Sequence, residues 1–208
     1  MNIAKYKDVS SNFSEIHYLK GELKMKSIAT AVICSVFALA GSNGVLAGDN
    51  KVLNEIVIGQ TPVADYLQSI KKRGCRYQKT TWTGMSGYSI APGCYNLPAV
   101  KNIYVVNAVN KYVTFVEITY QKSFGGQAFN SYLNALKKNY GRPVKSNIPY
   151  VGNKSAEFKS GNLSIVMEEP HMGWEGSIMF LPTQIWEEAQ KESVQKQANN
   201  QKELESLL

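Results

Sequence analysis

Two stretches of the chain repeat one pattern of apolar and polar positions. Residues 66–74 and 132–141 each run Tyr-Leu-polar-small-aliphatic-Lys-Lys and close on a glycine. The apolar residues recur at the three- and four-residue spacing of a single helical face. The lysine pairs stand where a last helical turn would expose its carbonyl groups, and positive charge is favourable there. The pattern therefore predicts two similar helices.

Start and stop signals support both predicted helices. Thr61 is placed to cap the first helix, and Pro62 to occupy its first position. Gly141 and Pro143 follow the second helix, as is typical beyond a helix end. The predicted apolar stripes are Val63, Tyr66, Leu67 and Ile70 in the first helix, and Phe129, Tyr132, Leu133, Leu136 and Tyr140 in the second.

The remaining apolar residues are arranged as in strands, with Val, Ile and aromatic side chains between turn residues. Strands are predicted at residues 53–58, 102–108, 111–120, 155–159, 163–168 and 176–181. The segment between the cysteines is rich in glycine, which predicts a loop with little regular structure. The predicted fold class is α+β: two α-β-β-type repeats form an antiparallel sheet with helices packed on one face. A C-terminal tail, helical or disordered and anchored by Trp186, follows.

An apolar run near the start of the chain has the features of an export signal. Residues 28–40 are uncharged and apolar, Lys24 and Lys26 precede them, and residues 45–47 end in a small-x-small cleavage site at Ala47. The run is shorter than the roughly 20 residues that a membrane span needs. We therefore predict cleavage near Ala47 and a periplasmic or secreted protein. A retained membrane anchor is the alternative.

These features divide the chain into four parts. Residues 1–24 are predicted to be an upstream extension that is not part of the native protein, because translation from Met25 gives a signal of ordinary length. Residues 25–47 are the signal peptide, 48–183 a single α+β domain, and 184–208 a polar tail. A chain of this length suits one domain that buries most of its surface.

The charge of the chain is compatible with an anionic partner. Lys and Arg number 23 against 16 Asp and Glu, which gives a formal net charge of +7. This excess can attract phospholipid headgroups, a glycan polymer or an acidic protein face. It can equally serve solubility alone. Nucleic acid is disfavoured as a partner because the protein is predicted to be exported.

Cysteine usage agrees with export. Cys34 leaves with the predicted signal, so Cys75 and Cys94 remain and allow a single disulfide. Closing a loop of this length stabilises a fold by roughly 3 kcal/mol. A catalytic thiol is the competing interpretation, but neither cysteine stands in a C-x-x-C pattern.

Two short motifs resemble those of known exported modules. One helix is opened by Ile58-Gly59-Gln60-Thr61, and another is closed by Lys138-Asn139-Tyr140-Gly141-Arg142-Pro143; each leads into predicted hairpins. This pattern, over residues 53–181, is similar to the outer-membrane-assembly lipoprotein family called BamE or SmpA and to the tandem-repeat β-lactamase inhibitor proteins. The resemblance implies a protein-binding module without a catalytic centre. The chain lacks the lipoprotein cysteine of the first group, and no site residue is carried over.

Catalytic patterns are weak in this sequence. His171 is the only histidine after the predicted signal, and zinc sites usually need three or four ligands. Glu168, Glu169 and Glu175 are the only carboxylate cluster that resembles a glycan-hydrolysing pair. Adjacent Glu168 and Glu169 would face opposite sides of a strand. We therefore predict no catalytic residue, no metal site and no cofactor.

Two groups of aromatic side chains are better candidates for a binding site. The first group, on or near the segment between the cysteines, consists of Trp82, Tyr88 and Tyr95 with Arg76 and Lys79. The second, in a later predicted hairpin, consists of Trp174 and His171. Aromatic residues on constrained loops lose little entropy on binding. The alternative is that Trp82 and Trp174 fill the core.

These observations favour an exported periplasmic binding or inhibitor module that docks an envelope protein. The alternative is a peptidoglycan-acting enzyme or accessory factor of the cell envelope. The expected partner is accordingly an envelope protein or a cell-wall polymer, and the mature chain is expected to have no integral membrane span.

Overall fold

The computed structural model describes residues 51–82, 85–107 and 111–206 of the chain. The predicted upstream extension and the predicted signal peptide lie outside the described residues. None of the helices within the described part is both long enough and apolar enough to cross a bilayer.

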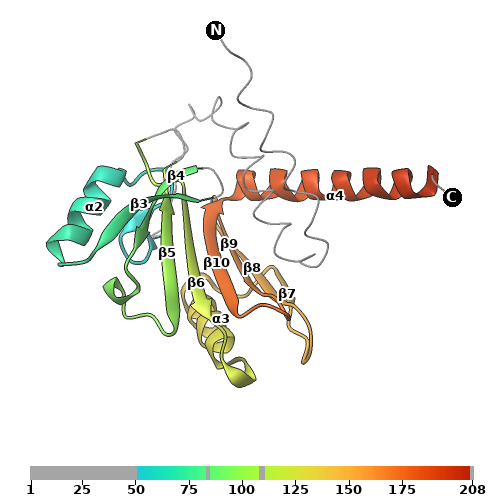
Figure 1. The fold of residues 1–208 in the computed structure, drawn as a ribbon, viewed down its shortest axis with the longest axis horizontal. Coiled ribbons are helices and arrows are strands. Elements are labelled where there is room, and N and C mark those ends of the chain that lie inside the picture. Colours follow the sequence, from blue (N-terminus) through green and yellow to red (C-terminus); the bar gives the residue numbers. More distant parts are fainter. Residues whose placement is uncertain (1–50, 83–84, 108–110, 207–208) are drawn as a thin grey trace, which may run out of the picture.

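One sheet of eight antiparallel strands forms the centre of the fold, with the order β3-β4-β5-β6-β10-β9-β8-β7 (Figure 1). In chain order the strands are β3 (Tyr77–Trp82), β4 (Met85–Ile90), β5 (Val100–Val106), β6 (Phe115–Gln121), β7 (Lys145–Asn147), β8 (Lys154–Ser160), β9 (Leu163–Glu169) and β10 (Glu175–Pro182). A separate two-stranded hairpin, β1 (Lys51–Val52) and β2 (Ile56–Val57), precedes them. The helices are α2 (Val63–Lys72), α3 (Gln127–Tyr140) and α4 (Thr183–Ser206). The predicted α+β class with an antiparallel sheet is confirmed.

The same element order occurs twice along the chain. Helix α2 is followed by β3 to β6, and α3 by β7 to β10. Strands β3 and β7 are the two edges of the sheet, while β6 and β10 pair with each other at its centre. We call α2 with β3–β6 the first half and α3 with β7–β10 the second half. Each half has four strands, where the sequence pattern predicted fewer.

Both of these helices cover one face of the sheet. The buried residues Ile70 of α2 and Leu136 of α3 share one core with strand residues such as Ile103, Ile118 and Ile165. The predicted apolar stripes are confirmed, since Val63, Tyr66, Phe129, Tyr132 and Leu133 are also buried. Helix packing against a half-apolar sheet face explains why the 3.6-residue pattern was readable from sequence.

Helix α4 contacts the opposite face of the sheet. Ile185 and Ala189 are buried there with Phe115, Val166 and Met179 of the strands. Beyond this anchored first part, α4 projects away from the sheet (Figure 1). The tail, predicted to be helical or disordered, is a single helix to Ser206.

Three local predictions are wrong. The segment between the cysteines holds the β3–β4 hairpin, not an irregular loop. The strand predicted at residues 53–58 is limited to Ile56–Val57 (β2), because residues 53–55 form the turn of the β1–β2 hairpin, in which Leu53 and Asn54 have positive φ. Thr61 does not cap α2, because its hydroxyl accepts a hydrogen bond from the Val57 amide at 2.8 Å.

Candidate functional site

The end of helix α2 places the first cysteine. Gly74 has a φ of 73°, and the Cys75 amide donates to the Ile70 carbonyl at 3.1 Å. This is the left-handed helix ending that glycine favours. Cys75 therefore leaves the helix towards Cys94, and the two Cα atoms lie 5.4 Å apart. The predicted disulfide is confirmed, and it closes the base of the β3–β4 hairpin.

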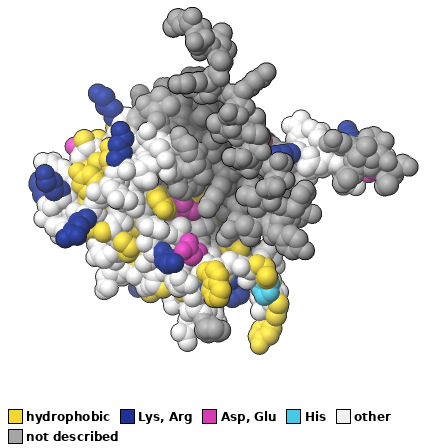
Figure 2. Space-filling view, viewed as in Figure 1, with side chains coloured by type: hydrophobic (Ala, Val, Ile, Leu, Met, Phe, Trp, Pro, Cys, Tyr) yellow, Lys and Arg dark blue, Asp and Glu magenta, His cyan; other side chains and the backbone are white. Residues whose placement is uncertain are grey.

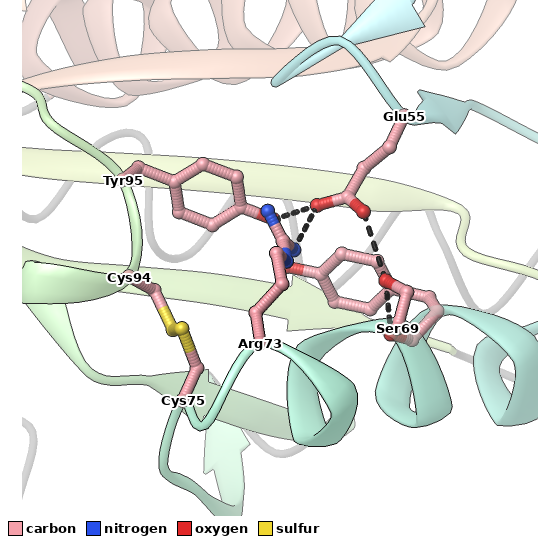
Figure 3. The surroundings of a disulfide bond; sticks show 7 residues. Glu55, Ser69, Arg73, Cys75, Cys94 and Tyr95 are labelled. Atoms are coloured by element: carbon pink, nitrogen blue, oxygen red, sulfur yellow. Dashed lines mark hydrogen bonds and ion pairs between the residues drawn. A yellow bond between two sulfur atoms is a disulfide. The ribbon is translucent and has the colours of Figure 1, made fainter.

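A polar network lies directly beside this disulfide (Figure 3). Arg73 Nη2 donates to Glu55 Oε1 at 2.5 Å, and Ser69 Oγ donates to Glu55 Oε2 at 2.8 Å. The Tyr95 hydroxyl also donates to Glu55, and the Arg73 guanidinium lies 5.0 Å from the centre of the Tyr95 ring. We call Glu55, Ser69, Arg73 and Tyr95 the Glu55 clasp. It joins the β1–β2 hairpin, helix α2 and the segment after Cys94.

Tyr66 and Tyr95, the two tyrosines beside Glu55, remain neutral at physiological pH. Burial raises the pKa of Tyr95 to about 12, and its hydrogen bond to Glu55 acts in the same direction. Burial also raises the pKa of Tyr66, whose hydroxyl lies 3.0 Å from that of Tyr95. Neutral hydroxyls keep their protons for hydrogen bonding. The Glu55 clasp therefore serves to position chain segments, and the hydroxyl of half-buried Tyr95 is hydrogen-bonded within it.

Strand β3 is the exposed edge beside the clasp. Arg76, Tyr77 and Lys79 are exposed, and the Tyr77 ring meets the ring of half-buried Tyr88 edge-on at 5.9 Å. Figure 2 shows Lys and Arg side chains spread over the side of the molecule where Figure 1 places α2. Of the predicted residues, Lys79 and Tyr88 lie opposite each other in the β3–β4 pairing, and Arg76 directly precedes β3. Trp82 ends β3, but its side chain lies outside the described part.

The second predicted group lies in the other half of the molecule. Trp174 is 81% exposed in the loop between β9 and β10, so it does not fill the core. His171 of the same loop is also exposed. Figure 2 shows hydrophobic side chains gathered beside the histidine. The binding roles of both groups stay predictions.

Sequence reasoning missed the neighbours of Trp174. Tyr150 and Val151, in the loop between β7 and β8, are 102% and 65% exposed. The two loops adjoin because β8 pairs with β9, and the His171 amide donates to Asn153 Oδ1 at 2.7 Å. The apolar run Ile148-Pro149-Tyr150-Val151 was a readable signal, but its proximity to Trp174 depends on strand pairing.

The three candidate carboxylates do not converge. Glu168 and Glu169 lie on opposite faces of β9, as predicted from their adjacency. Glu169 pairs with Lys154 at 3.3 Å and Glu175 with Lys101 at 3.0 Å. Burial raises the pKa of Glu168 to about 7, whereas the other two carboxylates each pair with a lysine. Within the described segments no group of three His, Cys, Asp or Glu residues is placed to hold a metal.

Comparison with known proteins gives no relative. The chain matches no protein-family model, no curated protein and no solved structure. The resemblance to exported α-β-β modules therefore stays a prediction, and the function has to be inferred from the geometry of the molecule.

Proposed function

We propose that this protein is an exported binding module that docks a protein of the cell envelope by adding a strand of that partner to the edge of β3. The observation that carries the proposal is the outer side of β3, which pairs with no other described strand, in a hairpin whose base the Cys75–Cys94 disulfide closes. The disulfide also supports export, because such bonds persist in oxidising compartments.

Strand β3 offers backbone groups on its outer side. It has six residues and pairs only with β4 among the described strands. Along an antiparallel strand, successive residues direct their backbone N–H and C=O groups alternately towards and away from the neighbouring strand. The Arg76 carbonyl accepts from the amide of Ala91, the residue after β4, at 2.9 Å. By this alternation the amides of Tyr77, Lys79 and Thr81 point outward. An unpaired edge of this kind can accept an extended segment of another protein.

Rigidity makes this edge a favourable docking surface. The disulfide closes the base of the β3–β4 hairpin, and the Glu55 clasp holds the segments on both sides of it. A strand that is ordered before binding loses less conformational entropy when its partner arrives. The hairpin is therefore prepared for pairing.

The side chains along β3 indicate the chemistry of the partner segment. Arg76 and Lys79 are exposed, whereas no Asp or Glu occurs in β3 or β4. Tyr77 and Tyr88 offer ring surface next to Lys79. The preferred partner is an extended segment with acidic and apolar side chains, since complementary charge speeds association and opposes wrong partners.

Site-specific crosslinking tests this function. A photo-reactive residue at Thr81 in the exported protein should give one major adduct with an envelope protein, and the same residue at exposed Asn134 of α3 should not. Lys79→Pro removes an outward amide that β4 does not use, and proline is tolerated on such an edge. Lys79→Ala removes only the side chain.

The two Lys79 variants separate charge from strand addition. We expect Lys79→Ala to weaken the Thr81 adduct modestly and Lys79→Pro to abolish it, with the disulfide and circular dichroism spectrum unchanged in both. Equal adduct yields from the two variants, or equal yields from Thr81 and Asn134, would contradict docking through β3.

A further inference from the structure

A second surface in the other half of the molecule goes beyond protein docking. It consists of Tyr150 and Val151 in the β7–β8 loop and Met172 and Trp174 in the β9–β10 loop, which we call the tip cluster. Their exposed fractions are 102%, 65%, 84% and 81%. Single exposed apolar residues are ordinary, but four large ones on two adjoining loops mark an interaction surface.

The loops of the tip cluster are held together and fixed to the sheet. Asn153 Oδ1 accepts from the His171 amide at 2.7 Å, which joins the two loops. The Trp174 carbonyl accepts from the Lys122 amide and from Gln121 Nε2, both at 2.9 Å. The exposed side chains therefore project from a supported backbone.

The backbone carbonyls of the Trp174 loop already have hydrogen-bond partners. Lys122 Nζ donates to the Pro170 carbonyl at 2.6 Å and to the His171 carbonyl at 3.1 Å. The Pro170 carbonyl also accepts from the Gly173 amide at 3.4 Å. Backbone N–H and C=O groups need hydrogen-bond partners within the protein before a segment can leave water for a lipid phase. This loop meets that condition at the three carbonyls of Pro170, His171 and Trp174.

The charges around the tip cluster do not oppose an anionic surface. Residues 148–153 and 170–174 contain no Asp or Glu. The carboxylates at the base of the second loop are paired, Glu169 with Lys154 and Glu175 with Lys101. Residues 48–208, which remain after the predicted cleavage, contain 18 Lys and Arg against 13 Asp and Glu, a formal net charge of +5. Anionic headgroups attract basic proteins near the bilayer surface.

We propose that the tip cluster inserts into the headgroup region of an anionic lipid bilayer, with Trp174 and Tyr150 as interfacial anchors. Trp and Tyr concentrate at membrane interfaces because an apolar ring and a polar group suit that depth. The four side chains are exposed on two adjoining loops, and exposed apolar side chains can be buried at the boundary of headgroups and acyl chains. The β3 edge lies in the other half of the sheet and stays free for a protein.

Flotation with lipid vesicles tests the proposal. The purified protein should float with vesicles of phosphatidylcholine and phosphatidylglycerol, less with phosphatidylcholine alone, and less at high salt, which screens the headgroup charge. The double variant Tyr150→Ala/Trp174→Ala should lower partitioning on the order of tenfold or more, as loss of interfacial anchors predicts. Val194→Ala, which removes an exposed apolar side chain from α4 (66% exposed), is the matched control.

Tryptophan fluorescence gives an independent readout. Anionic vesicles should shift the emission of the wild type to shorter wavelength, and Trp174→Phe should abolish that shift while Trp82 and Trp186 still emit. Flotation that is absent for the wild type, or that the double variant leaves unchanged, would overturn the bilayer proposal. A protein adduct from a crosslinker at Trp174 in lipid-free extract would overturn it as well.

The two proposed surfaces can fail separately. Lys79→Pro should leave flotation unchanged, and the double tip variant should leave the Thr81 crosslink unchanged. A wild-type protein that floats but gives no Thr81 crosslink would contradict only the docking proposal. One that gives the crosslink but does not float would contradict only the bilayer proposal.

Discussion

The two halves of the molecule share an element order but are stabilised by different means. In the first half no described residue of β3 is buried, and its hairpin is tied by the Cys75–Cys94 disulfide and the Glu55 clasp. In the second half Ala156, Glu157 and Phe158 of β8 are buried, and α4 covers the far face. Edge strand β7 of the second half is exposed as well, and β4 of the first half buries Met85 and Ile90. The disulfide therefore adds a covalent restraint to packing in the first half, where none of the described side chains of β3 is buried.

The halves also differ in what they expose. The first half presents backbone and basic side chains along β3, with its aromatic rings partly turned inward at Tyr88 and Tyr95. The second half presents large apolar side chains at loop tips, such as Trp174 and Tyr150. One fold thus offers two surfaces of different chemistry. The expected effects below test this contrast, beginning with the largest.

Removing a core ring should destabilise the second half most. Phe158 has no exposed surface, so Phe158→Ala leaves a cavity and should lower the free energy of unfolding by roughly 3–5 kcal/mol. Chemical denaturation measures this change. Asn134→Ala, at an exposed position of α3, serves as control and should have little effect. A small loss for Phe158→Ala would mean that packing does not dominate this half.

Removing the disulfide should act on the first half. Cys75→Ala/Cys94→Ala should lower the free energy of unfolding by about 3 kcal/mol, because the unfolded chain loses its crosslink. Hydrogen exchange should rise in β3 and β4 while β8 and β9 keep their protection. Uniformly raised exchange across the sheet would show that the two halves open as one unit.

The Glu55 clasp should make a smaller contribution. Glu55→Gln keeps the size of the side chain but removes the charge that Arg73 and Tyr95 contact, at a cost of about 1 kcal/mol, since Arg73 is partly exposed. The pKa of Tyr95 should fall below about 12 in this variant but stay above 10, because burial remains. Ultraviolet titration of tyrosine ionisation measures it. An unchanged Tyr95 pKa would show that Glu55 has no influence on it.

Glu168 should give the weakest signal, a slope of stability with pH. Burial raises its folded-state pKa to about 7, above roughly 4.3 in an unfolded chain. The folded protein then binds the proton more tightly, so this stabilisation is complete at low pH and is lost as pH rises through about 7. Glu168→Gln should remove this pH dependence of the free energy of unfolding, and exposed Glu192→Gln should not. Identical pH profiles for all three proteins would refute the shift.

Local sequence patterns determined the parts of this protein that depend on a single element. The apolar stripes around Tyr66 and Tyr132 predicted both helices on one face, because a helix repeats every 3.6 residues regardless of its neighbours. The strands from β5 to β10 other than β7 were also predicted, because each buries side chains and its apolar residues therefore alternate with polar ones or stand in a run. Once Cys34 was assigned to the predicted signal, the two remaining cysteines allowed only one disulfide.

The two edge strands could not be predicted from the pattern of apolar residues. Strands β3 and β7 carry mostly polar, exposed residues, so no apolar periodicity distinguishes them from loops. Their pairing with β4 and β8 comes from backbone hydrogen bonds, which every residue except proline can make.

The candidate surfaces were predicted only as separate residues. The sequence singled out Lys79, Tyr88, Tyr95 and Trp174, but it did not show that the Tyr95 hydroxyl bonds Glu55. Tyr150 and Trp174 are far apart in the chain and adjoin because β8 pairs with β9. The sequence alone determined the helices, most strands and the covalent tie, each set by local periodicity or composition. The tertiary structure decided which loops meet and which strands form the edges of the described sheet, because strand pairing joins residues that are distant in the chain.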